Sequence, residues 1–273
     1  MDFRTPQGQE RYDALVAAAP GVLVGLDFDG TLSPIVDDPE RAVIHPDGPR
    51  VLTALASRVR AVVVVTGRPA RQVVELGDLE KVADGLPDGA RLVVMGQYGN
   101  ERWDAASREF TSPEPPPGLQ AFRDELPRLL KAERAERAHV EEKGLAVAVH
   151  TRRLPDPGAA FARLEEALAD AAERHGLSLE PGRMVLEVRA PGMHKGLALQ
   201  TAVEEHEARG VLFAGDDLGD LEAFEVVRGL RDGGMPALLV CSGSQEEEAL
   251  AELADVVVDG PGGVLGLLDG FAA

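Results

Sequence analysis

Several short runs rich in valine and leucine occur along the chain, and within them apolar residues do not alternate with polar ones. The first three such runs lie at 22–26, 61–65 and 91–95. Strands buried on both faces have this composition, and they are typical of parallel sheets covered by helices. Helical stretches at 48–58 and 69–76 separate the three runs. This order predicts an α/β fold with a doubly wound parallel sheet.

The same alternation of helices and strands resumes in the last third of the chain. The sequence there predicts helices at 195–208, 218–227 and 245–253, and strands at 211–214, 237–241 and 256–258. We expect these strands to extend the sheet begun by the first part.

The middle of the chain has a different pattern. Four prolines stand in 111–118, where they break regular structure and form a stiff linker. A helix followed by two strands is then predicted twice, at 119–137, 140–143 and 145–151, and again at 158–175, 177–180 and 184–189. We therefore expect an inserted α+β domain at 111–191, with an antiparallel sheet and helices on one face. The core would comprise 1–110 and 192–273.

Charge and cysteine content narrow the class of partner. The formal net charge is −19, so the surface repels nucleic acid and anionic membranes, and we expect neither as a partner. One cysteine, Cys241, excludes an internal disulfide and fits a reducing compartment. Residues 1–10 lack the pattern of a signal peptide. We expect a cytoplasmic protein, for which a monomer is compatible with every feature of the sequence.

Three polar motifs each follow a predicted buried strand. Asp27-Phe28-Asp29-Gly30-Thr31 follows the first strand, Thr66-Gly67-Arg68 the second, and Gly215-Asp216-Asp217 the strand at 211–214. Ligands of open parallel sheets bind outside the carboxyl ends of the strands. All three motifs should then meet at one edge. Each motif alone also fits a turn or a helix cap, so their convergence is the informative feature.

These residue types suit phosphoryl transfer. Asp27 is placed as a nucleophile toward phosphorus, and Asp29 could protonate the leaving alkoxide and then activate water. Asp27, the main-chain carbonyl of Asp29, and Asp216 would supply oxygen ligands to Mg²⁺. The Thr66 hydroxyl could bind phosphoryl oxygens, and Lys195 could supply the positive charge that the acidic surface lacks.

The motifs resemble those of the haloacid dehalogenase-like phosphatase superfamily, at Asp27–Thr31, Thr66, Lys195 and Gly215–Asp217. The inserted segment lies where a type C2 cap occurs. Within the superfamily the chain resembles trehalose-6-phosphate phosphatases from Gly21 to about Asp259. Matching segments there include Thr66-Gly67-Arg68, Val140–Gly144, His150-Thr151-Arg152, Leu186–Arg189 and Gly215–Phe224.

The resemblance implies a haloacid dehalogenase-like core, a Mg²⁺ cofactor and a phospho-aspartate on Asp27. Asp217 and Asp220 would stand beside the metal ligands. Substrate contacts are implied for Arg68, Glu141, Lys143, Arg152, Arg183 and Glu187. Without the resemblance, a solvated strand edge would be the preferred explanation of Glu141, Glu142 and Lys143. The implied reaction is hydrolysis of trehalose 6-phosphate.

Two other functions stay open. The same core residues would serve a phosphatase for another sugar phosphate, such as a sucrose-phosphate type, because only the cap discriminates. A catalytically silent sugar-phosphate sensor, or a partner subunit of a synthase, is the alternative outside enzymes. The chain departs from the family pattern at Tyr98, Gly219 and Leu221, where histidine, threonine and glutamate are usual.

Overall fold

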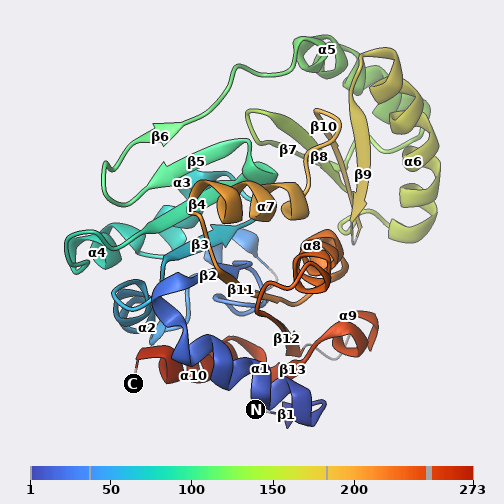
Figure 1. Cartoon of the computed structure of the whole chain (residues 1–273). Helices are drawn as coiled ribbons and strands as arrows, with labels where there is room; N and C mark the ends of the chain where they lie inside the picture. Colours follow the sequence, from blue (N-terminus) through green and yellow to red (C-terminus); the bar gives the residue numbers. More distant parts are fainter. Residues whose placement is uncertain (1, 37, 183, 244–247, 273) are drawn as a thin grey trace. The chain divides into compact units, whose positions relative to one another are not determined.

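The computed structural model describes residues 2–36, 38–182, 184–243 and 248–272 (Figure 1). The chain divides into two compact units. Unit 1 comprises Met1–Ser112 and His194–Ala273, and unit 2 comprises Pro113–Met193. Each unit has its own sheet and its own apolar core.

The sheet of unit 1 has the strand order β1-β13-β12-β11-β2-β3-β4-β5-β6. The six strands β13, β12, β11, β2, β3 and β4 pair with one another in parallel, whereas β1 pairs with β13, β5 with β4 and β6 with β5 in the antiparallel direction. The fold class predicted from the valine-rich runs is therefore confirmed. The strands are β1 (Asp2–Phe3), β2 (Val22–Leu26), β3 (Ala61–Val65), β4 (Leu92–Gly96), β5 (Glu101–Asp104), β6 (Phe110–Thr111), β11 (Gly210–Gly215), β12 (Ala237–Gly243) and β13 (Val256–Asp259).

Helices cover both faces of this sheet (Figure 1). Successive residues of the central strands point to opposite faces, so Val24 packs in one apolar layer and Leu23 in the other. One layer contains α1 (Pro6–Ala17), α2 (Gly48–Ala56), α3 (Ala70–Leu76), α4 (Leu79–Asp84) and α10 (Gly260–Ala272), and the other contains α7 (Lys195–Glu205), α8 (Leu221–Asp232) and α9 (Glu248–Leu253). Short 3₁₀ turns are η1 (Ala19–Gly21), η2 (Pro39–Arg41), η3 (Gln97–Gly99) and η4 (Leu218–Asp220).

Several elements of unit 1 differ from the sequence prediction. The hairpin of β5 and β6 was not predicted, because Trp103 is the only fully buried residue of the charged strand β5. The helix predicted at 218–227 begins as the turn η4, since Asp217 and Asp220 form a capping box there, and α8 continues to Asp232. Of the helix predicted at 245–253, the structure describes the part from Glu248 to Leu253 as α9, because residues 244–247 lie outside the described residues.

Unit 2 is an antiparallel sheet with its two helices packed on one face. The strand order is β7-β8-β10-β9. Val147, Val149, Leu186 and Val188 point toward the helices and share their apolar core. Residues between them along the strands, such as Ala148 and Glu187, belong to the opposite face. The elements are α5 (Pro117–Ala132), β7 (His139–Glu142), β8 (Ala146–His150), α6 (Pro157–Arg174), β9 (Ser178–Gly182) and β10 (Val185–Arg189).

Helix α5 ends earlier than predicted. The sequence pattern predicts a helix to residue 137, whereas α5 ends at Ala132. Arg134 has a left-handed backbone, with a φ of 54°, and the amide of Ala135 donates to the carbonyl of Leu130. This contact closes the helix in the manner of a C-terminal Schellman turn.

Among the described residues of both units, no helix has the length and apolar character needed to span a bilayer.

Candidate active site at the carboxyl edge of the unit 1 sheet

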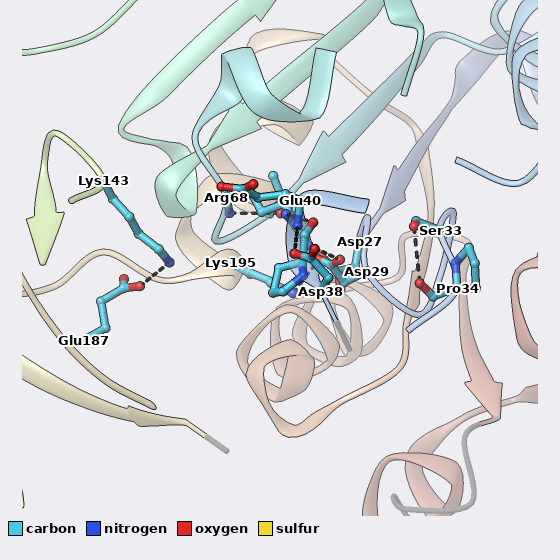
Figure 2. A network of polar contacts seen from close by, with 12 residues as sticks. Asp27, Asp29, Ser33, Pro34, Asp38, Glu40, Arg68, Lys143, Glu187 and Lys195 are labelled. Atoms are coloured by element: carbon cyan, nitrogen blue, oxygen red, sulfur yellow. Dashed lines mark hydrogen bonds and ion pairs between the residues drawn. The ribbon is translucent and has the colours of Figure 1, made fainter. Parts of the chain in front are cut away.

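Three adjacent strands end at the predicted motifs. The strand order β11-β2-β3 puts the carboxyl ends of these strands next to one another. The loops that follow them carry Asp216, Asp27 and Thr66. Figure 2 shows Asp27, Asp29, Arg68 and Lys195 gathered at this edge. The convergence expected from the sequence is thus present in unit 1.

A buried lysine joins two carboxylates at the centre of the site. The Nζ atom of Lys195 lies 2.8 Å from Oδ1 of Asp27 and 2.8 Å from Oδ1 of Asp220. The exposed fractions of the three side chains are 7%, 5% and 0%. Lys195 is the first residue of α7, whose N-cap His194 accepts a hydrogen bond from the amide of Leu197. The helix start therefore holds the ammonium group at the strand ends.

The site carries more negative than positive charge. Burial raises the pKa of Asp27 well above its ordinary range, and the lysine opposes this rise. Burial, together with the charges of Asp217 and Asp220, raises the pKa of Asp216 to about 8. Burial lowers the pKa of the Lys195 ammonium, but Asp220 and Asp27 outweigh that effect, so its pKa lies well above its ordinary range. The lysine stays charged, and a second cation would relieve the remaining repulsion.

An oxygen-lined cluster could hold that second cation. Within the described residues, Asp27, Asp216 and Asp220 each offer a carboxylate oxygen, and these oxygens lie within 4.8 Å of one another. All three residues are buried. Hard divalent cations such as Mg²⁺ prefer carboxylate oxygens. The donor set and the uncompensated charge therefore fit a divalent metal.

Asp220 has a larger part in the cluster than the sequence suggested. Its Oδ1 accepts from Lys195, and its Oδ2 accepts from the amide of Asp216 at 3.0 Å and more weakly from that of Asp217 at 3.4 Å. Both oxygens are thus engaged in holding the lysine and the motif loop. Asp217 itself accepts from the amide of Gly219. These contacts fix the loop that presents Asp216.

Glycine is required beside Asp216. Gly30 has a φ of +69°, and a Cβ added to it would lie 2.0 Å from Oδ2 of Asp216. The loops after β2 and β11 therefore approach each other as closely as a glycine allows. Ser242 of β12 secures this approach, because its hydroxyl donates to the carbonyl of Gly30 at 2.6 Å. Ser242 was not predicted as a site residue, since no local motif surrounds it.

Asp29 is held by an arginine from the neighbouring loop. The Nε atom of Arg68 donates to Oδ2 of Asp29 at 2.6 Å, and Nη2 donates to Oδ1 at 2.7 Å. Nη1 of the same side chain donates to the carbonyl of Pro39 at 2.9 Å. Arg68 was predicted as a substrate-binding residue, and in unit 1 its guanidinium pairs with the second aspartate of the motif. A bidentate pair of this kind fixes both position and orientation.

Thr66 lies at the end of β3 and is buried. Its Oγ1 accepts from the amide of Arg68 at 3.1 Å, which closes the loop that carries the arginine. The Oγ1 atom of Thr31, also buried, has no hydrogen-bond partner among the described residues. Thr66 thus follows the strand next to that of Asp27, and its hydroxyl shapes the loop that carries Arg68.

A second polar group lies on the face of the unit 2 sheet opposite its two helices. Nζ of Lys143 donates to Oε2 of Glu187 at 2.6 Å (Figure 2). Nε2 of His150 lies 2.9 Å from Oε2 of Glu141. Glu141 and Glu187 are both in register with Ala148 of the strand between them. Three of the predicted substrate residues therefore share one face of this sheet.

Two other residues of unit 2, Arg152 and Arg183, were predicted to contact the substrate. Arg152 is an exposed residue in the turn after β8. Arg183 lies outside the described residues. The sequence prediction also missed Arg189, which is buried two positions after Glu187 on the same face and lies 3.5 Å from a carboxylate oxygen of Glu180. The period of two along β10 could have indicated it.

Comparisons with known proteins point to one family. The model of the family described as trehalose-phosphatase matches residues 25–257. A trehalose-phosphate phosphatase of Mycolicibacterium paratuberculosis is 32% identical over 87% of this chain and 61% of its own length. A protein named "Probable trehalose-phosphate phosphatase 3" in Oryza sativa subsp. japonica is 27% identical over 96% of this chain and 77% of its own. This chain thus spans about three fifths of the bacterial relative and about three quarters of the plant one.

A solved structure has the same fold. The C-terminal domain of C. albicans trehalose-6-phosphate phosphatase superimposes with a TM-score of 0.74 at 21% identity. The superposition covers 98% of this chain and 96% of the fungal domain.

Proposed function

The chain belongs to the trehalose-phosphatase family, and we propose that it hydrolyses trehalose 6-phosphate to trehalose and phosphate through a phospho-aspartate on Asp27. The observation that carries this proposal is the buried Lys195 ammonium, which lies 2.8 Å from Asp27 where three strand ends meet. A phosphoryl group bound there would face an ionised carboxylate and a fixed positive charge.

Each core residue would have a separate task. Lys195 favours the ionised form of Asp27, so that one oxygen can attack phosphorus. Thr66 offers a hydroxyl for the phosphoryl oxygens at the neighbouring strand end. Asp29 would give a proton to the leaving sugar oxygen and then, in the ionised form that its pair with Arg68 favours, take one from the attacking water. These roles require no large rearrangement of the loops described above.

The acidic cluster supports a role for Mg²⁺. We propose that Asp27, Asp216 and the main-chain carbonyl of Asp29 hold the ion, with Asp217 and Asp220 fixing the loop around it. When bound, Mg²⁺ would neutralise charge on the phosphoryl oxygens. The fit rests on the three buried carboxylates and on the raised pKa of Asp216.

We propose that unit 2 is the cap that recognises the sugar and excludes water during the reaction. That the cap comprises residues 111–191, with boundaries at 110/111 and 191/192, stays a prediction. Hydroxyl groups of a disaccharide are well matched by carboxylates and cations that each make several hydrogen bonds. The residues proposed for this task are Glu141, Lys143, Arg152, Arg183 and Glu187.

Two alternative functions can be distinguished from the proposed one by experiment. A phosphatase for another sugar phosphate would use the same core with different cap contacts. A silent sensor has no need of a nucleophile, and the intact pair of Asp27 and Lys195 favours an enzyme. The cytoplasmic location and the monomeric state stay predictions.

The first experiment is phosphate release from trehalose 6-phosphate and a panel of other sugar phosphates, in Mg²⁺ and in EDTA, with Asp27→Asn as the blank. We expect preferential turnover of trehalose 6-phosphate that Asp27→Asn and EDTA abolish. Turnover of a different sugar phosphate would preserve the core chemistry and overturn the cap assignment. Binding without turnover by the unsubstituted chain would favour the sensor.

A further inference from the structure

The loop that carries Thr66 and Arg68 is held from the side by the loop after β4. The amide of Tyr98 donates to the carbonyl of Thr66 at 2.9 Å. The amide of Gln97 donates to the carbonyl of Arg68 at 2.8 Å. These two backbone hydrogen bonds connect consecutive strand ends of the sheet, so the position of one loop depends on the other.

Glu101 joins the same two loops through its side chain. Its Oε2 accepts from the amide of Ala70, the first residue of α3, at 2.7 Å, and its Oε1 accepts from Nε2 of Gln97 at 2.8 Å. The residue before α3 is Pro69, which makes no capping hydrogen bond. A carboxylate from β5 therefore satisfies a helix-start amide that its own segment leaves unpaired.

The loop after β4 needs such support because its backbone is unusual. Gln97, Tyr98 and Gly99 have φ angles of 45°, 59° and 95° in succession. Two side-chain-bearing residues in the left-handed region are strained, and they persist only when neighbouring contacts hold them. Gly96 also packs against α3 so closely that a Cβ on it would lie 2.4 Å from the nitrogen of Ala70.

We propose that Glu101 is a positioning residue that keeps Arg68, and through it the ionised carboxylate of Asp29, in the orientation required to take a proton from the water that attacks the phospho-aspartate. This inference rests on the proposed function. The path runs from Glu101 to Ala70 and Gln97, and from their loops to Arg68, whose guanidinium holds both oxygens of Asp29. Glu101 itself touches no reacting atom in this scheme.

The test separates the two halves of turnover with 4-nitrophenyl phosphate. Nitrophenolate leaves readily without an acid, whereas attack of water on the phospho-aspartate needs a base. We expect Glu101→Ala to release nitrophenolate in the first turnover at the rate of the unsubstituted chain and then to turn over at least about tenfold more slowly. Glu101→Gln keeps a side-chain oxygen for the amide of Ala70 and should restore part of the steady-state rate. Equal slowing of the first turnover and of the steady state would mean a merely structural role and would overturn the proposal.

A matched control removes a helix-start contact elsewhere in unit 1. The hydroxyl of Thr5 accepts from the amide of Gly8 at 3.1 Å and caps α1. Thr5→Ala should lower stability without changing the ratio of the first-turnover rate to the steady-state rate. If Thr5→Ala changed that ratio as much as Glu101→Ala, the ratio would report stability, and the proposal would fall.

A readout without turnover keeps the inference separate from the proposed function. The exchange rate of the Arg68 Nε–H proton, measured by ¹⁵N NMR, reports its hydrogen bond to Asp29. We expect this exchange to be at least about tenfold faster in both Glu101 variants than in Thr5→Ala. Unchanged exchange would overturn the inference even in an active enzyme. Faster exchange would support it even if no sugar phosphate were hydrolysed, an outcome that would refute only the proposed function. If Glu101→Ala failed to fold, Glu101→Gln would carry both measurements.

Discussion

Replacing Asp216 by asparagine is expected to stabilise unit 1 when no divalent cation is bound, and the effect should grow as the pH rises. Asp216 is buried, and its pKa is raised to about 8 by burial and by the charges of Asp217 and Asp220. A folded-state pKa above the unfolded value means that folding takes up a proton between the two values. Stability is therefore lost as the pH rises from 3.8 to about 8.

The size of the effect follows from the two pKa values. At about 1.4 kcal/mol for each pKa unit, their difference corresponds to a loss of unfolding free energy of about 6 kcal/mol over the whole pH window. At pH 7 the loss is about 4 kcal/mol. Asparagine cannot ionise, so it removes this loss of unfolding free energy, but it leaves a buried amide whose imperfect hydrogen bonding costs about 1–3 kcal/mol. We expect Asp216→Asn to gain about 1–3 kcal/mol over the unsubstituted chain at pH 7. Between pH 5 and pH 8 the difference should grow by about 4 kcal/mol.

Urea unfolding in EDTA measures this difference at each pH. The chain has one tryptophan, Trp103, which is fully buried on β5, so its fluorescence reports the unfolding of unit 1. Asp13→Asn is the matched control, because Asp13 is exposed and its hydrogen-bond partner is a neighbouring glutamine. Added Mg²⁺ should stabilise the unsubstituted chain more than Asp216→Asn, since a ligand stabilises the state that binds it.

A stability difference that stayed the same at pH 5 and pH 8 would refute the reasoning. It would show that the Asp216 carboxyl is not destabilised by burial and by its neighbours. A pH dependence equally large in Asp13→Asn would assign the effect to overall charge.

Three further predictions concern single contacts. Gly30→Ala should weaken Mg²⁺ binding at least about tenfold by titration calorimetry, because its Cβ would fall 2.0 Å from a carboxylate oxygen of Asp216; unchanged affinity would contradict the proposed metal site. Ser242→Ala should lower the unfolding free energy by about 1–2 kcal/mol in urea, since the buried carbonyl of Gly30 would lose its 2.6 Å hydrogen bond; an unchanged midpoint would contradict this. The hydrogen bond from His175 is the main cause that lowers the pKa of Glu125 to about 2. The ionised Glu125 side chain therefore stabilises unit 2 above about pH 4.5, and this stabilisation is lost as the pH falls toward 2. Circular dichroism should then show a shallower acid transition in this window for Glu125→Gln, and an identical transition would rule the contribution out.

Much of the core site could be predicted from the sequence because its residues follow buried strands. Val22–Leu26, Ala61–Val65 and Gly210–Gly215 are strands for local reasons, namely short apolar runs without polar alternation. Parallel pairing then brings their carboxyl ends together whatever the details of packing. Asp27 and Asp216 were therefore expected at one edge, and that edge contains them.

The hairpin of β5 and β6 shows where local pattern is insufficient. Strand β5 is a strand because it pairs with β4 and buries Trp103, while its other side chains are charged. No periodicity in four such residues distinguishes a strand from a loop. The sequence around Glu101 therefore does not indicate its contact with Ala70.

The sequence alone determined the layered α/β architecture, the inserted second unit and the motif residues at the strand ends, since these follow from periodicity and from the geometry of parallel strands. The tertiary structure decided which long-range contacts the side chains make. Arg68 meets Asp29 across 39 residues, Glu101 meets Ala70 across 31, and Ser242 meets Gly30 across 212. Such pairs depend on strand register and on side-chain rotamers packed at close range, and no local sequence pattern encodes either of these.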